Sequence, residues 1–185
     1  FALTIPMWRN KQNPSESKPL QITDYKTSII LTLRQSRVWI SISLFFLYVG
    51  AEISVGLWTY SLLVEARHID ARQAGFFAGS FWAMFTIGRI VAGFFAKRIG
   101  NHLLVQGGLS FAILGTLLLI WNPFEAANLI AVALIGFAIA PIFPALMSGT
   151  SERVNANFAA NTIGLQIAAS GLGSALIPSL LGILA

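Results

Sequence analysis

The residue with the clearest capacity for chemistry in this sequence is Glu52, a carboxylate deep inside an apolar segment. That segment runs from about Val38 to Leu63. At 1.5 Å per residue it is long enough to cross a bilayer core of about 30 Å. A charge at such a depth costs about 2.5–3.5 kcal/mol on insertion scales, and it normally faces a cavity, pairs with a partner or carries a proton. We therefore expect neighbouring helices to build a cavity around Glu52.

Two further polar side chains share the helical face of Glu52. Tyr48 lies one turn before it and Thr59 two turns after it. A phenol, a carboxylate and a hydroxyl can hydrogen-bond a polyhydroxyl ligand, and a carboxyl in a low-dielectric site suits proton coupling. The alternative is a buried glutamate tied to a neighbouring helix. We favour the cavity.

The next apolar segment carries Trp82 and Arg89 on one face. Trp82 can stack on the apolar face of a sugar ring, and ordinary packing is an equally good interpretation. Arg89 lies roughly 12 Å along the axis from Lys97. We expect it to reach the membrane surface or to belong to an inner gate, in preference to binding substrate directly.

The last apolar segment has two faces. We expect its stripe of small residues to pack closely on another helix. That stripe comprises Gly164, Ala168, Gly171 and Ala175. Gln166, Ser170 and Ser174 point the other way and are predicted to line a polar path. Interhelical hydrogen bonding by Gln166 is the alternative.

These residues need membrane-spanning helices to position them, and the composition agrees. Hydrophobic residues make up 56% of the chain and charged residues 10%, where a soluble domain carries about 25%. The sequence predicts an all-α, polytopic membrane protein. Five transmembrane helices are expected near 38–63, 74–96, 103–121, 127–149 and 158–184. Pro141 and Pro144 should kink the fourth span, and Pro178 the fifth.

The basic residues fix the expected orientation. Placing 9–37, 97–102 and 151–157 in the cytoplasm puts nine of the twelve basic residues inside. The protein should then lie in an inner or plasma membrane. Residues 9–37 read as a cytoplasmic linker, and 1–8 as the end of a truncated transmembrane helix. The basic pI follows from this asymmetry, so we expect no nucleic-acid partner.

The sequence contains no enzyme signature. It lacks a phosphate-binding glycine loop with lysine, a Gly-x-Ser-x-Gly elbow and paired histidines. It has no cysteine, and its two histidines are isolated at segment edges. We expect no enzymatic activity, no cofactor and no metal site.

Several strings resemble known transporters. The Gly93–His102 stretch is similar to a cytoplasmic loop motif of the major facilitator superfamily, with Arg98 and Gly100 matching. Tyr48–Gly56 resembles the seventh helix of the sugar permease branch that contains fucose–proton and glucose/galactose permeases. Gly136–Pro144 resembles the tenth helix of that branch, and Gln166–Gly173 the eleventh.

The resemblance implies an architecture. Residues 38–185 would be the C-terminal transmembrane half-bundle, with helices seven to eleven of the family's fold and five of the six in that half. Residues 9–37 would be the central loop, and the N-terminal half would lie outside this chain. A cavity between the halves would open alternately to each side. Helices seven, eight, ten and eleven would border it, and nine would be peripheral.

The function implied is secondary active transport, with proton-coupled sugar uptake as the leading hypothesis. The expected substrate-binding or proton-coupling residues are Glu52, Tyr48, Thr59, Trp82, Gln166 and Ser170, and the expected gate residues are Arg89, Arg98 and Gly100. The expected partners are a sugar, a proton, the lipid bilayer and the N-terminal half. A drug or metabolite exporter of the same fold, or a non-transporting membrane sensor, remain as alternatives.

Overall fold

A computed structural model describes residues 28–184 of the chain, and this part contains helices and no strands. The helices are α2 (Ile29–Leu33), α3 (Ser36–Ser61), the π-helical turn η1 (Leu62–Ala66), α4 (Ala71–Ile99), α5 (Asn101–Trp121), α6 (Ala126–Ile139), α7 (Ile142–Ser148), α8 (Thr150–Val154) and α9 (Ala156–Leu184). Five helical stretches are long and apolar enough to cross a membrane. The all-α prediction and the five predicted spans are thus confirmed. The interpretation of residues 1–8, and of the linker up to residue 27, lies outside the described residues.

The helix ends follow local chemistry. The Asp70 side chain caps α4 by accepting hydrogen bonds from the backbone N–H groups of Arg72 and Gln73. Gly100 separates α4 from α5 with a φ of 81°, a conformation that favours glycine. Asn122 ends α5 in the left-handed region. These caps set the short connections between the spans.

The fourth span is interrupted at Pro141, one of the two predicted positions, whereas Pro144 lies inside the continuous helix α7. Its helix α6 ends at Ile139 and α7 begins at Ile142, with Pro141 between them. Proline has no N–H to donate and its ring disfavours the preceding helical turn. The predicted interruption is therefore present. By contrast, α9 continues as one helix through Pro178.

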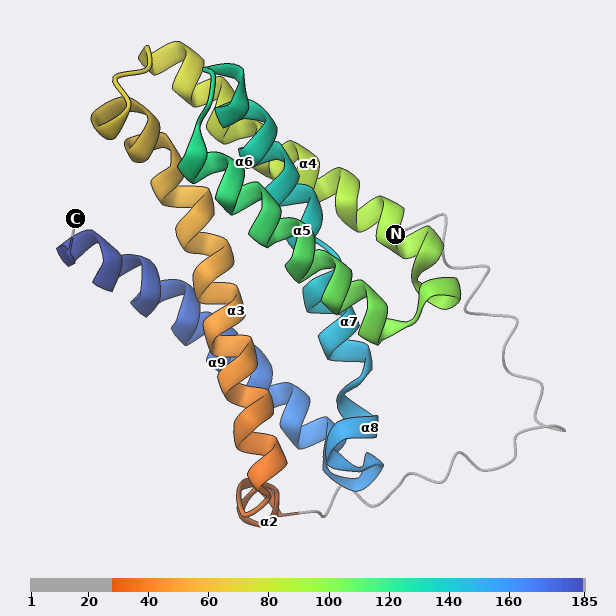
Figure 1. Ribbon diagram of the computed structural model, residues 1–185. Coiled ribbons are helices and arrows are strands. Elements are labelled where there is room, and N and C mark those ends of the chain that lie inside the picture. The colour runs from red at the N-terminus through yellow and green to blue at the C-terminus, as the bar shows by residue number, and fades with distance from the viewer. Residues whose placement is uncertain (1–27, 185) are drawn as a thin grey trace, which may run out of the picture.

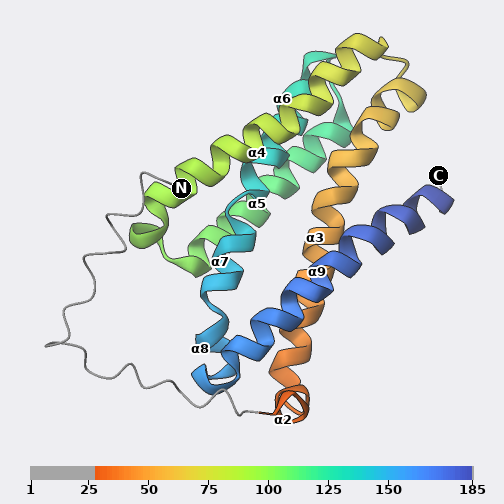
Figure 2. The ribbon, with the colours of Figure 1, turned by 180° about the vertical axis from the view of Figure 1, so that it is seen from behind.

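The helices form two packed groups, visible in both ribbon views (Figures 1 and 2). One group is the pair α3 and α9, which cross each other. In the other group, α6 packs between α4 and α5. The main apolar core lies between α4 and the α6–α7 span, around Phe81, Val132 and Ile135.

Glycines allow the closest helix contacts. A Cβ atom on Gly136 of α6 would lie 3.0 Å from the carbonyl carbon of Phe81 in α4. A Cβ on Gly173 of α9 would lie 2.9 Å from the carbonyl carbon of Phe46 in α3. Both are too close for a real side chain. These two glycines therefore set the spacing of their helix pairs.

The predicted packing face of α9 is wrong. Its members Gly164, Ala168, Gly171 and Ala175 are all exposed, and a Cβ on Gly164 or Gly171 would meet nothing within 4 Å. The face that packs on α3 instead carries Gln166, Ser170 and Gly173. This face packs on α3 because Ser41 of α3 accepts a hydrogen bond from Gln166, and because Gly173 has no side chain to keep it from the backbone of Phe46.

Candidate functional site

Glu52 lies in a pocket between three spans, of which one consists of α6 and α7. Its side chain is only 7% exposed, and it lines a cavity of about 500 Å³ formed by α3, α5, α6 and α7. Among the fourteen residues around this cavity, only Tyr48, Glu52 and Thr116 have polar side chains. The expected cavity around Glu52 is present, and its wall is mostly apolar. Its borders differ from the prediction, because α5, the segment expected to be peripheral, lines it, whereas α4 and α9 do not.

The carboxyl group of Glu52 is incompletely satisfied. Its Oε2 atom is buried and has no hydrogen-bond partner among the described residues. The Tyr48 phenol interacts with the same carboxyl group and donates a hydrogen bond to the Ile139 carbonyl at 2.7 Å. The positive charge of Arg89 in α4 is near enough to attract Glu52 electrostatically. A buried carboxyl with a free oxygen is suited to binding a proton or a donor group of a ligand.

Thr59 and Trp82 lie away from this cavity. The buried Thr59 hydroxyl donates to the Val55 carbonyl in its own helix, at 2.6 Å. Trp82 packs against Gly56 of α3 and edge-on to Phe81, with ring centroids 5.0 Å apart. Its indole is still 40% exposed. The structure thus brings Tyr48 and Glu52 together but not Thr59 or Trp82.

Gln166 belongs to a separate set of polar side chains, which we call the Gln166 cluster: Gln166, Ser41 and Thr150. Gln166 is fully buried, and its Nε2 donates to the Ser41 hydroxyl at 2.5 Å and to the Thr150 hydroxyl at 3.1 Å. The Ser170 hydroxyl donates to the backbone carbonyl of Gln166 at 2.9 Å. Interhelical hydrogen bonding, the alternative interpretation of Gln166, is therefore what the structure shows.

The expected gate residues lie in the second half of α4 and in the turn that follows it. Arg89 is exposed, and its guanidinium carbon lies 4.4 Å from the centroid of the Phe85 ring, a cation–π contact. Arg98 is exposed near the end of α4, and Gly100 forms the turn that follows. Among residues 28–184, no carboxylate forms an ion pair with Arg98.

Among the polar contacts that sequence reasoning missed is one made by Arg67. The Arg67 guanidinium donates to the Asn128 side-chain oxygen and to the Leu119 carbonyl, so it ties the α3–α4 connection to α5 and α6. Asn128 is almost fully buried near the start of α6. The sequence signal for this contact was Asn128 itself, a single amide side chain in an otherwise apolar segment.

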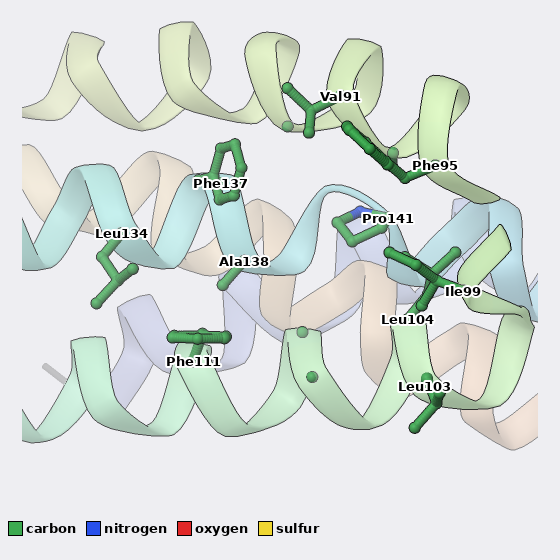
Figure 3. A pocket seen from close by; sticks show the side chains of 14 residues that line it. Val91, Phe95, Ile99, Leu103, Leu104, Phe111, Leu134, Phe137, Ala138 and Pro141 are labelled. Carbon is green, nitrogen blue, oxygen red and sulfur yellow. The ribbon is translucent and has the colours of Figure 1, made fainter.

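A second cavity, of about 340 Å³, lies between α4, α5 and the α6–α7 break. Figure 3 shows Phe95, Phe111 and Phe137 around it. Every residue lining it is apolar, so it offers no hydrogen bond to a polar solute. In the part of the chain that the structure describes, no three His, Cys, Asp or Glu side chains gather as a metal site would require. Of these two cavities, only the Glu52 pocket has an ionisable carboxyl group in its wall.

A polytopic bundle with an isolated carboxyl in a midspan cavity is typical of membrane transporters. The family model described as Major Facilitator Superfamily matches residues 1–178. The chain belongs to this superfamily of transporters.

Three curated proteins are similar to the chain. They are Bypass of stop codon protein 6 of Saccharomyces cerevisiae, 27% identical over 83% of the chain; Sodium-dependent glucose transporter 1A of Mus musculus, 26% over 76%; and Glucose/mannose transporter GlcP of Bacillus subtilis, 30% over 74%. Each match covers 33% of the relative, so the chain spans about a third of the length of these proteins. No solved structure gives a significant match.

Proposed function

We propose that the chain forms part of a secondary transporter that takes up a sugar with a proton by alternating access. Two of its relatives carry glucose in their names, one of them as a sodium-dependent transporter and the other as a glucose/mannose transporter. The observation that carries the proposal for the coupling ion is the free, buried Oε2 of Glu52. We place the protein in an inner or plasma membrane. Residues 9–37, 97–102 and 151–157 then face the cytoplasm, as the positive-inside rule predicts.

Glu52 acts as the proton carrier in this proposal. In one state the carboxyl is protonated and neutral, which suits its apolar surroundings. In the other state it releases the proton, and the negative charge is stabilised by the attraction of Arg89 and by Tyr48, once the phenol turns its proton from the Ile139 carbonyl to the carboxylate. Exposure of the pocket to each side of the membrane in turn would make the proton cross with the solute.

Sugar binding requires more polar groups than this pocket holds. Of its lining only Tyr48, Glu52 and Thr116 can hydrogen-bond a hydroxyl. The half-exposed indole of Trp82 is available as a stacking face. We propose that the remaining contacts come from the other helices of the transporter, in keeping with the greater length of the relatives. Arg89, Arg98 and Gly100 are assigned to the inner gate.

The test is proton-driven uptake of labelled glucose by the full-length protein in proteoliposomes. Glu52→Gln keeps the size of the side chain and removes its titration, so we expect at least about a tenfold loss of uptake driven by a pH gradient. Exchange of sugar without a gradient should persist. Glu65→Gln, an exposed carboxylate at the end of the same span, is the matched control and should behave as wild type. Equal gradient-driven uptake in Glu52→Gln would refute the role of Glu52.

An exporter of apolar drugs or metabolites is the second candidate, and the apolar wall of the Glu52 pocket favours it. Efflux of an apolar compound, without sugar uptake, would select this function. A proton-coupled exporter would still need Glu52, so the two candidates differ in substrate and direction and share the coupling residue.

A further inference from the structure

Two arginines, Arg37 and Arg153, line a small cavity beside the N-terminal end of α3. The cavity, of about 260 Å³, is lined by Arg37, Ile40, Ser41, Leu44 and Arg153. It is distinct from the Glu52 pocket, with which it shares only Leu44. No carboxylate lines it. We propose that this cavity binds the phosphate headgroup of an anionic phospholipid.

The Arg153 guanidinium is held in place on one side. Its Nη2 donates to the Leu146 carbonyl and, at 3.3 Å, to the Thr150 hydroxyl. Its Nε is buried without a partner among the described residues. Burial lowers the pKa of Arg153, while the adjacent Glu152 acts in the opposite direction. A partly desolvated cation of this kind gains from a second anion nearby.

The other side of the cavity also offers donors. Arg37 forms no hydrogen bond or ion pair with residues 28–184, so its charge there is uncompensated. Ser41 is 2% exposed and accepts from Gln166, and its own hydroxyl proton has no acceptor within the described part. Two guanidinium groups and one hydroxyl are a donor set suited to phosphate oxygens.

The apolar members of the cavity point to a lipid as the source of that phosphate. Arg37, Ile40, Ser41 and Leu44 follow one face of α3 at helical spacing. Ile40 is 62% exposed and Leu44 43% exposed, so an apolar surface continues from the arginines toward the bilayer centre. A headgroup phosphate at Arg37 would place acyl chains along this surface. In the orientation proposed above, this is the cytoplasmic leaflet, which is rich in anionic lipid.

Native mass spectrometry of the full-length protein with added lipid tests the proposal. Phosphatidylglycerol should bind more tightly than phosphatidylcholine, and inorganic phosphate should not displace it at equal concentration. Arg37→Gln should weaken phosphatidylglycerol binding by roughly five- to tenfold. Arg34→Gln removes the same charge from an exposed residue outside the cavity and should leave binding unchanged.

Three results would overturn the proposal. Equal binding of the two lipids would show that no anion site exists, and equal losses in the two variants would show general surface attraction only. Displacement by inorganic phosphate would assign the cavity to a small anion. Lipid binding can be lost while Glu52-dependent uptake is retained, so this test is separate from that of the transport function.

Discussion

Two sets of buried polar side chains lie along α3, and they differ in how fully their hydrogen-bonding groups are used. In the Gln166 cluster, the amide bonds to hydroxyls of α3 and α8. In the Glu52 pocket, a carboxyl oxygen has no partner among the described residues. Each buried polar atom of the Gln166 cluster has at least one partner, although the Ser41 hydroxyl proton is not donated within the described residues. Such a network stabilises one packing arrangement, whereas a buried atom with no partner at all is available for a ligand or a proton. We propose that this contrast separates a structural contact from a functional one along the same helix.

Gly173 provides the strongest test of the structural side of this comparison. It lies against the backbone of Phe46, on the α3–α9 interface that also contains the Gln166 cluster. We expect Gly173→Ala to force the two helices apart and to lower the free energy of unfolding by about 1–3 kcal/mol. Gly171→Ala is the matched control, because a Cβ there meets nothing within 4 Å. Thermal unfolding in detergent measures both. Equal melting temperatures would contradict the packing described.

The packing face of α9 was predicted wrongly because contacts with α3 decide it, and those contacts are not visible in the sequence of α9. The apolar blocks identified all five spans, and Glu52 was conspicuous because a carboxylate in such a block is rare. The packing face of α9 could not be chosen in this way, because both Gly171 and Gly173 are small. Only the position of Phe46 and Ser41 on α3 decides between them. The Arg67–Asn128 contact was missed for a related reason: it joins residues far apart in the sequence.

Replacing Gln166 should have the next largest effect. Gln166→Leu removes the amide and leaves the hydroxyls of Ser41 and Thr150 buried with fewer partners. We expect a loss of about 1–2 kcal/mol in unfolding free energy. Ser174→Ala, on an exposed hydroxyl of the same helix that bonds only its own backbone, should cost under about 0.5 kcal/mol. If Gln166→Leu abolished sugar binding without destabilising the protein, Gln166 would be a ligand of the substrate after all.

The central claim is that the carboxyl of Glu52 exchanges a proton. Infrared difference spectroscopy of the full-length protein between acidic and alkaline pH tests it most directly, because the C=O stretch of a protonated carboxyl is resolved from that of a carboxylate. Solvent-exposed carboxyl groups contribute bands common to all variants. We predict in addition a titrating C=O component at the higher frequency of a buried carboxyl, which is lost in Glu52→Gln and retained in Glu65→Gln. An identical buried-carboxyl component in wild type and Glu52→Gln would contradict the account.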